Sequence, residues 1–288
     1  MNNNLVRALR ILPDKIYIQL MYYHFFHKFV NFRNPVTYNE KLQWLKVNYR
    51  NPEYTKLVDK HLVKEVVANK IGEEYVLPTY GVYSCPEEID FDELPNQFVL
   101  KCNHDSGSVA ICKDKSSFNK DEALLILRKG LRRNGYWYGR EWPYKHVKPL
   151  IIAEKYIEDS TAQDLKDYKF FCFDGYVDNV MMVVGRHTDH ARFYHFDRNW
   201  HICHYNRLGR KLPDDFTLPK PQNIDKMFEL AEKLSKGFPE VRIDLFNVDG
   251  HIYFGEYTFF NESGFETGFD FESDKHLGDL IELPPVMK

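Results

Sequence analysis

The chain lacks several features that would assign it to a specialised class of protein. Its five cysteines are odd in number and show no CxxC spacing, which argues against a disulfide framework and against a zinc site. No apolar run approaches the ~20 residues that a transmembrane segment requires, and residues 1–8 do not resemble a signal peptide. The formal net charge is only −3, so no global field favours nucleic acid or an anionic membrane. We therefore expect a cytoplasmic globular protein without a nucleic-acid partner, whose oligomeric state the sequence leaves open.

The residues that are present suit a folded enzyme with an unusual share of aromatic side chains. Hydrophobic residues make up 43% of the 288 positions, which is enough to bury a large core. Aromatic residues reach 16%, which favours aromatic-rich strands or stacking surfaces. The stretch 16–30, rich in Tyr, Phe and Leu, predicts either a buried helix or a helix on a membrane surface. We expect it to be buried, with peripheral membrane association as the alternative.

Helical signals dominate residues 1–75, and strand signals follow. Thr37 and Glu40 form a capping-box pattern, and the apolar positions of 62–71 keep helical spacing up to Gly72. Further helices are expected at 119–133 and 223–236, strands at 98–101, 108–112 and 150–157, and hairpins at 168–184 and 241–258. No internal repeat, low-complexity tract or long linker interrupts the chain, so the pattern predicts one α+β body.

The hairpin 241–258 is the most informative segment because charges lie inside strands that otherwise look suited to burial. The charged residues are Arg242, Asp244 and Glu256. A buried unpaired charge costs roughly several kcal/mol, so strand interiors rarely carry three of them without a use.

The type of turn decides whether these charges meet. A two-residue turn at 249–250 would pair Asp244 with Gly255 and place Asp244 and Glu256 on opposite faces. We instead expect a three-residue loop, 248–250, with its glycine in the left-handed conformation as a bulge. Such a loop brings four side chains onto one face, those of Arg242, Asp244, Glu256 and Thr258.

Two adjacent carboxylates repel each other unless a cation lies between them. Mg²⁺ prefers such a sparse oxygen site in combination with phosphate groups, so Asp244 and Glu256 are candidate metal ligands. The alternative is a cross-strand ion pair between Arg242 and Glu256 on a solvated face.

A second candidate site is the strand, loop and strand at 98–112. Lys101 ends the first strand, and the small polar loop after it offers exposed backbone amides. Such a loop can fold over phosphates while the lysine contacts their oxygens. The sequence is not a Walker A motif, and an ordinary hairpin with a snorkelling lysine is an equal alternative.

Three further positions give weaker signals. Glu154 lies in an apolar strand, 151–157, whose backbone could face an adenine edge, although simple strand termination is the commoner reason for such a pattern. Lys169 lies in another apolar strand, where a lone lysine usually points to solvent. Arg186 follows in a polar loop and could hold an anionic group.

The segment 128–148 interleaves seven basic residues with five Tyr and Trp residues. That composition suits a flat acceptor, either single-stranded nucleic acid or a charged saccharide. The alternative is a solvated basic helix followed by a loop that its aromatic residues anchor.

The order of these motifs along the chain resembles the order of the corresponding motifs in the ATP-grasp superfamily. The hairpin with Arg242, Asp244 and Glu256 is similar to the metal-binding hairpin of D-alanine–D-alanine ligases, and 154–157 looks like their adenine-binding strand. More specifically, the chain resembles the TupA-like ATP-grasp proteins over residues 35–275. The segments that carry this closer resemblance are 35–45, 59–60, 99–104, 168–175 and 254–259.

The resemblance implies an α+β ATP-grasp fold in which two lobes clasp ATP, preceded by an N-terminal helical segment. The implied boundaries are 1–58 for the helical segment, 59–288 for the core, 76–158 for the nucleotide lobe and 159–275 for the metal lobe. The implied metal ligands are Asp244, Glu256 and Thr258. Related ligases usually carry Asn where Thr258 stands, so Asn261 is an alternative ligand.

The resemblance also implies roles for the other candidates. Arg242, Lys169 and Arg186 would be catalytic. The nucleotide would contact Lys101, Asn103, His104, Ser106, Gly107, Ser108, Glu154, Lys155, Tyr156, Ile157 and Lys169.

The implied reaction uses ATP and Mg²⁺ to join a carboxylate to an amine through an acyl phosphate. The implied partners are a carboxylate-bearing saccharide of a surface polysaccharide and an amine or amino acid, with 128–148 as a candidate acceptor surface. A kinase acting on a sugar hydroxyl is an alternative, because fold does not fix reaction. A glycosyltransferase or a non-catalytic accessory protein of the same pathway is a further alternative, and nucleic-acid binding ranks last.

Overall fold

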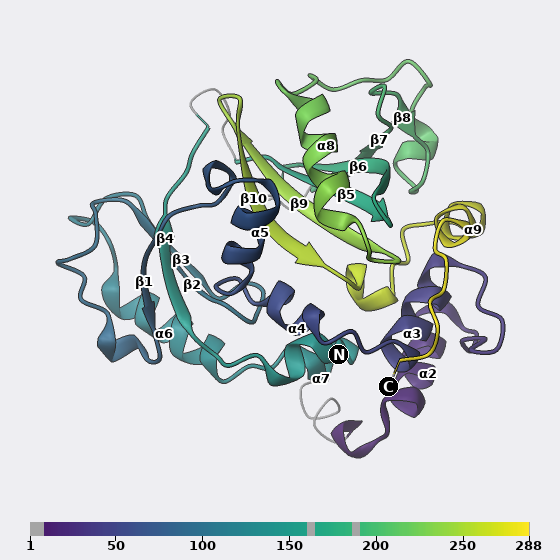
Figure 1. Ribbon diagram of the computed structural model, residues 1–288, viewed down its shortest axis with the longest axis horizontal. Coiled ribbons are helices and arrows are strands. Elements are labelled where there is room, and N and C mark those ends of the chain that lie inside the picture. The colour runs from purple at the N-terminus through teal and green to yellow at the C-terminus, as the bar shows by residue number, and fades with distance from the viewer. Residues whose placement is uncertain (1–8, 160–164, 186–190, 288) are drawn as a thin grey trace.

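The computed structural model describes residues 9–159, 165–185 and 191–287, which form two antiparallel sheets with helices around them (Figure 1). The smaller sheet has the strand order β1-β4-β2-β3, and the larger has the order β10-β9-β5-β6-β7-β8. The chain is therefore of mixed helix and strand content with two separate sheets. The division into lobes at the boundaries given above stays a prediction.

The helices of the first quarter of the chain lie between and beside the sheets. They are α2 (Asp14–Phe26), α3 (Tyr38–Asn48), α4 (Glu53–Val58) and α5 (Val63–Ile71). The predicted capping box at the start of α3 is confirmed, because the Thr37 side chain accepts from the Glu40 amide while the Glu40 carboxylate accepts from the Thr37 amide. The predicted helix end at Gly72 is also confirmed, with that glycine at a φ of 122°.

The smaller sheet contains β1 (Thr79–Tyr83), β2 (Phe98–Cys102), β3 (Val109–Cys112) and β4 (Ile151–Lys155). The helix α6 (Lys120–Leu131) contacts β2 and β3, and buries Ala123 and Leu127 against a core that includes Phe98 and Leu100. The short α7 (Tyr136–Gly139) follows α6 and leads back to β4. The strands predicted at 98–101, 108–112 and 150–157 are therefore present.

The larger sheet contains β5 (Asp167–Phe173), β6 (Tyr176–Val184), β7 (Arg192–Phe196), β8 (Ile202–Cys203), β9 (Val241–Val248) and β10 (His251–Thr258). The helix α8 (Ile224–Ser235) covers one face, contacting β5, β6 and β9. The helix α9 (Phe271–Asp279) packs on α3. Short 3-10 helices occur at η1 (Leu9–Ile11), η2 (Glu73–Tyr75), η3 (Pro86–Glu88), η4 (Trp142–His146), η5 (Gly209–Lys211) and η6 (Asn261–Gly264).

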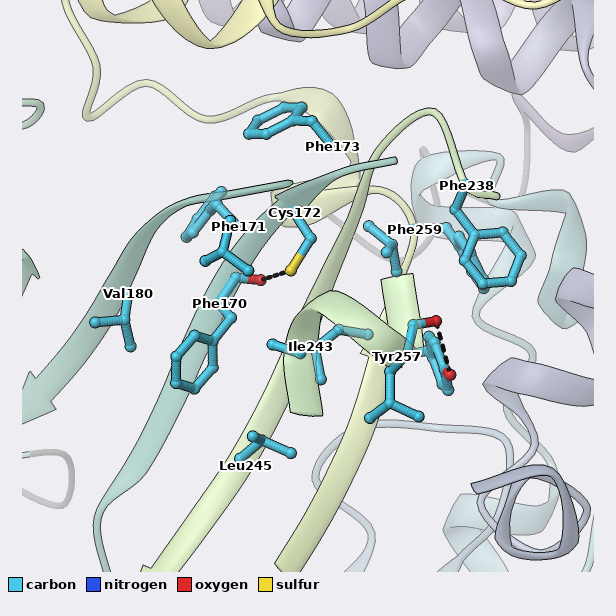
Figure 2. Packing of buried hydrophobic residues seen from close by; sticks show 14 of the residues in the cluster. Phe170, Phe171, Cys172, Phe173, Val180, Phe238, Ile243, Leu245, Tyr257 and Phe259 are labelled. Atoms are coloured by element: carbon cyan, nitrogen blue, oxygen red, sulfur yellow. Dashed lines mark hydrogen bonds between the residues drawn. The ribbon is translucent and has the colours of Figure 1, made fainter. Parts of the chain in front are cut away.

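The two faces of the larger sheet differ because side chains alternate along each strand. Figure 2 shows Phe170, Ile243 and Leu245 among the buried apolar residues of one part of the core, where Phe170 packs edge-on against Phe228 of α8. Residues one step along the strands, Lys169 and Asp244, belong to the opposite face and lie opposite each other in the β5–β9 ladder. The apolar face thus fixes where the charged face points.

The predicted three-residue loop in the β9–β10 hairpin is wrong. His251 pairs with Val248, so the turn contains only Asp249 and Gly250, at φ values of 51° and 86°. The ladder shifts further along, between Phe254 and Glu256. The extra residue there is Gly255, where an added Cβ would lie 2.9 Å from the Asp244 carbonyl oxygen.

The displaced bulge has the same consequence as the predicted one. Beyond Gly255, Glu256 pairs with Asp244 and Thr258 with Arg242, so both pairs share one face of the sheet. The expected meeting of these four side chains therefore occurs, by a bulge in the strand and not in the turn.

The predicted burial of the stretch 16–30 is only half right. One face of α2 is buried through Tyr17, Ile18, Met21 and Tyr22, but Ile16, Leu20 and Tyr23 are each about half exposed. No helix in the described ranges is both long and apolar enough to cross a bilayer.

A buried acid couples the stability of the core to pH. Glu240, just before β9, is fully buried and accepts a hydrogen bond of 2.7 Å from Tyr38 of α3. Burial raises the pKa of the Glu240 carboxyl to about 8 from the ordinary 4.5. The folded protein therefore keeps a proton that the unfolded chain releases, so the free energy of unfolding falls as pH rises from 4.5 to about 8.

We expect Glu240→Gln to remove this pH dependence. The glutamine amide keeps an acceptor for Tyr38 and does not ionise. At pH 8 the free energy of unfolding of the variant should therefore exceed that of the wild type by on the order of 3 kcal/mol. Urea unfolding of both proteins from pH 5 to 8 measures the difference. Parallel curves for the two proteins would show that Glu240 does not hold the proton.

Candidate functional site

A group of charged side chains occupies the face of the larger sheet opposite α8. It is centred on Arg242, whose guanidinium is held by both oxygens of the Asp244 carboxylate, Nε to Oδ1 at 2.7 Å and Nη2 to Oδ2 at 2.8 Å. Lys169 binds the same carboxylate and also lies 2.7 Å from Asp167. Arg242, Lys169 and Asp244 are each less than a tenth exposed, so these are ion pairs of the protein interior.

The predicted metal ligands surround the same guanidinium. Arg242 donates to the Asn261 amide oxygen at 2.5 Å and to the Thr258 hydroxyl at 3.1 Å, and it lies 3.6 Å from a Glu256 oxygen. The contact between Arg242 and Glu256 is the cross-strand pair of the alternative interpretation. That interpretation also placed the pair on a solvated face, which is not the case because Arg242 is buried.

Ion pairing keeps the Asp244 carboxylate and the Arg242 guanidinium in their charged forms inside the protein. Burial by itself would raise the pKa of the Asp244 carboxyl, but Arg242 and then Lys169 outweigh burial and hold that pKa below its ordinary value. Asp244 likewise raises the pKa of Arg242, against the effect of burial. The site therefore retains the Asp244 carboxylate and the Arg242 guanidinium in their charged forms at neutral pH.

The donor set fits a divalent cation by chemical type. Asp244, Glu256, Thr258 and Asn261 offer carboxylate, hydroxyl and amide oxygens, which are the ligands that Mg²⁺ takes in proteins. Asp244 and Glu256 could hold such a cation only if Arg242 gave up part of its contacts. Within the described ranges, no group of three or more His, Cys, Asp or Glu residues is placed to hold a metal ion, so a cation here would depend on phosphate oxygens as well.

This site opens into a cavity of about 820 Å³ between the two sheets. Five of the predicted site residues line it, namely Arg242, Glu256, Thr258, His104 and Ser106. The cavity therefore joins the late hairpin to the loop after β2, but Lys101, Lys169 and Asp244 are not part of its lining.

Lys60 also lines this cavity and was not among the predicted site residues. Its ammonium lies 3.6 Å from Glu256 and donates to the Asp105 backbone oxygen at 3.0 Å, so it spans the space between the sheets. Arg133 also lines the cavity, 3.6 Å from the Asp105 carboxylate. The segment 59–60 was part of the family resemblance, which is the signal that could have identified Lys60 as a site residue.

The loop after β2 is held in place by the side chain of Asn103. This buried amide donates to the Lys148 backbone oxygen at 3.0 Å and accepts from the Leu150 amide at 2.8 Å. Ser108 donates to the Asp105 carboxylate at 2.5 Å, and Gly107 has a φ of 91°. Asn103, Gly107 and Ser108 thus shape the loop, while His104 and Ser106 face the cavity.

Lys101 and Glu154 meet on neighbouring strands. The Glu154 carboxylate binds the ammonium of Lys101 at 2.5 Å and that of Lys64 at 2.6 Å, and it is almost fully buried. Burial would raise the pKa of Glu154, but the two lysines lower it below its ordinary value. Lys64 is thus a second cation at this carboxylate, and it was not among the predicted site residues.

The structure places the rest of the predicted adenine strand away from the cavity lining. Lys155 donates its amide to the Pro78 carbonyl at 3.0 Å, and Tyr156 binds the Glu158 carboxylate at 2.9 Å. Neither these residues nor Ile157 lines the cavity. The predicted nucleotide contacts of 154–157 stay predictions, and Arg186 lies outside the described residues.

The segment 128–148 has two roles in the structure. Tyr136, Arg140 and Trp142 are buried, and Arg140 lies over the Tyr17 ring at 4.4 Å from its centroid. These buried aromatic residues anchor the loop, as in the alternative interpretation, and Arg140 packs it against Tyr17 of α2. A second set faces the cavity instead, and it comprises Arg132, Arg133, Asn134, Gly135, Trp137, Tyr138, Glu141 and Tyr144.

The sequence matches the model of a known protein family. A family model described as TupA-like ATPgrasp matches residues 40–282. No curated protein shows a significant sequence match.

Solved structures that match this chain include several ligases. The D-alanine–D-alanine ligase from Bacillus anthracis, complexed with ATP, is 17% identical at a TM-score of 0.46, and the match covers 78% of this chain and 65% of that one. The D-alanine–D-alanine ligase from Helicobacter pylori is 14% identical at a TM-score of 0.46, covering 87% and 68%. The L-amino acid ligase from Bacillus licheniformis is 12% identical at a TM-score of 0.45, covering 78% and 49%. The chain thus spans about two thirds of the D-alanine–D-alanine ligases, and similarity at this level says nothing of its substrate.

Proposed function

Because the chain belongs to the TupA-like ATPgrasp family, we propose that it is an ATP-dependent ligase that joins a carboxylate to an amine. The observation that supports this proposal most is the cavity between the sheets, which collects Lys60, Arg133, Arg242 and Glu256. Several cations lining one cavity suit the phosphate chain of a nucleotide.

The first step proposed is transfer of the terminal phosphoryl group. A carboxylate oxygen of the substrate forms a bond to the γ-phosphorus, the bond from that phosphorus to the β–γ bridging oxygen breaks, and ADP leaves. Lys60, Arg133 and Arg242 would neutralise the charge that spreads over the phosphoryl oxygens. Asp244 and Glu256, with Thr258 or Asn261, would hold Mg²⁺, which when bound offsets phosphate charge.

The second step proposed forms the amide. The amine nitrogen attacks the acyl carbon, the carbon–oxygen bond to phosphate breaks, and inorganic phosphate leaves, while the amine proton passes to solvent or to phosphate. Glu141 lines the cavity and accepts a hydrogen bond of 2.5 Å from Ser263. It would help to hold the turn of η6 beside the reacting groups.

The proposed carboxylate substrate is a uronic-acid-bearing saccharide of a surface polysaccharide, and the amine is an amino acid or another amine. The exposed ring of Tyr138, together with Trp137, Arg132 and Arg133, lines the cavity. Aromatic and basic side chains side by side suit an anionic sugar ring. The protein is proposed to act in the cytoplasm.

Isotope transfer tests the reaction. Glucuronic and galacturonic acids with ¹⁸O in the carboxyl group, each supplied with ATP, Mg²⁺ and a mixture of amino acids, serve as probes. Ligation through an acyl phosphate moves one ¹⁸O into each inorganic phosphate, which mass spectrometry detects. ADP formation with the phosphoryl group retained on the sugar would instead establish the kinase alternative.

A further inference from the structure

The outer face of α2 is an apolar surface that the proposed reaction does not use. Ile16, Leu20 and Tyr23 follow one another at the i, i+4 and i+7 spacing of one side of the helix, and they are 50%, 47% and 50% exposed. Phe29, just after the helix, is 59% exposed and stacks on Tyr23 at a centroid distance of 5.0 Å. We call these four side chains the α2 outer face.

The opposite side of α2 is already used for packing. Tyr17, Ile18, Met21 and Tyr22 lie in a small core with Phe265, and α2 contacts α3 at the margin of the molecule (Figure 1). The helix is therefore apolar on both sides, whereas a surface helix of a globular protein normally turns a polar side to water. A cluster of large, solvent-exposed apolar side chains indicates a contact surface.

Charge near this face identifies its partner. Residues 10–33 contain four basic residues, Arg10, Lys15, Lys28 and Arg33, and a single acidic one, although the whole chain has a net charge of −3. All four basic residues are exposed. The acidic residue, Asp14, is engaged by Arg50 at 3.0 Å and by Tyr136 at 2.5 Å, so it offsets little of the positive charge outside.

We propose that the α2 outer face docks on the surface of an anionic lipid bilayer. Ile16, Leu20, Tyr23 and Phe29 would enter the boundary between headgroups and acyl chains, while the four cations contact lipid phosphates. Tyrosine suits this depth because its ring is apolar and its hydroxyl remains hydrated.

The helix that carries the docking face also borders the two cavities through residues outside that face. Arg10 lines the cavity of the candidate site, and Phe25 of α2 lines a neighbouring cavity of about 650 Å³. Tyr17 donates a hydrogen bond of 2.6 Å to the backbone oxygen of Tyr138, and Tyr138 lines both cavities. Docking through α2 would therefore hold both cavities close to the lipid headgroups.

Vesicle flotation of the full chain tests the proposal. We expect the protein to float with vesicles of phosphatidylcholine that contain phosphatidylglycerol, and to bind less as salt rises or when phosphatidylglycerol is left out. The triple variant Ile16→Ser, Leu20→Ser, Tyr23→Ser should lower the partition coefficient about tenfold or more, because three apolar side chains no longer leave water. The matched control is Val109→Ser, Ile111→Ser, which removes exposed apolar side chains of β3 and should bind as the wild type does.

Two further measurements separate docking from misfolding and from self-association. Lys15→Glu with Lys28→Glu leaves the apolar residues in place and should also abolish flotation on anionic vesicles. Binding of Mg²⁺ and AMP-PNP, followed by calorimetry, should be the same in every variant, which shows that the fold is intact and keeps this test independent of the proposed reaction. Failure of the wild type to float, equal flotation of the triple variant, or a wild-type dimer that the triple variant converts to monomer would each overturn the proposal.

Discussion

Glu256→Gln is expected to weaken Mg²⁺-dependent binding of AMP-PNP by at least about 100-fold, because the protein would lose one of two charged oxygen ligands. The same change should leave stability nearly unaltered. The Glu256 side chain is 38% exposed and its two ionic contacts, to Lys60 and Arg242, are both 3.6 Å long, so the pairs contribute on the order of 1 kcal/mol or less. Calorimetric titration with and without Mg²⁺ measures the affinity, and thermal unfolding measures the stability.

Glu65→Gln is the matched control for Glu256→Gln. Glu65 also forms an ion pair, with Lys56 at 3.2 Å, but it is 74% exposed and lies on α5 outside the cavity lining. Its substitution should change neither nucleotide binding nor unfolding. If Glu256→Gln bound AMP-PNP and Mg²⁺ as the wild type does, the assignment of Glu256 as a metal ligand would be wrong.

Asp244→Asn is expected to destabilise the protein strongly as well as to abolish Mg²⁺-dependent nucleotide binding. Asp244 neutralises Arg242 and shares Lys169 with Asp167, and removing one partner of a buried pair costs about 3–5 kcal/mol. For a chain of this size the loss corresponds to a fall in Tm of roughly 10 °C. Calorimetric unfolding measures the change in Tm.

The pH dependence of this stabilisation has a definite sign. The pKa of the Asp244 carboxyl is lowered below 3.8 in the folded protein, so its contribution is complete above pH 3.8 and is lost as pH falls through the lower, folded value. The contribution of Glu240 has the opposite sign and falls as pH rises towards 8. The two effects are therefore separable in unfolding curves.

A double substitution distinguishes loss of charge balance from simple loss of packing. Arg242→Met together with Asp244→Asn removes both partners, while Lys169 keeps its contact with Asp167. We expect the double variant to recover most of the stability lost in Asp244→Asn, because no buried charge is left unpaired. It should not recover nucleotide binding. A single variant as stable as the wild type would contradict the buried network.

Local signals in the sequence were sufficient for most elements of the fold. The capping box at Thr37, the helix end at Gly72 and the alternating strands each depend on neighbouring residues, so the sequence alone predicts them. The position of the β-bulge was not predictable in this way. The turn at Asp249 and Gly250 has the two residues that such turns favour, and the bulge at Gly255 is defined only by pairing with Asp244.

The same distinction between local signals and long-range pairing applies to the candidate site. The order of charged residues along the chain and the family resemblance are sufficient to single out Arg242, Asp244, Glu256 and Lys169. Lys169 and Asp244 are 75 residues apart in the sequence and meet only because their strands pair. No pattern among neighbouring residues predicts such a contact. The sequence could not show that Arg242 lies among the proposed metal ligands.

The sequence by itself determined the secondary structure, the family and the chemical identity of the charged groups, because these depend on residue type and local spacing. Only the tertiary structure decided which charges neutralise one another, that Lys60 reaches Glu256 across the cavity, and that one side of α2 remains in contact with water. The physical reason is that burial and charge pairing are set by the packing of segments distant in the chain.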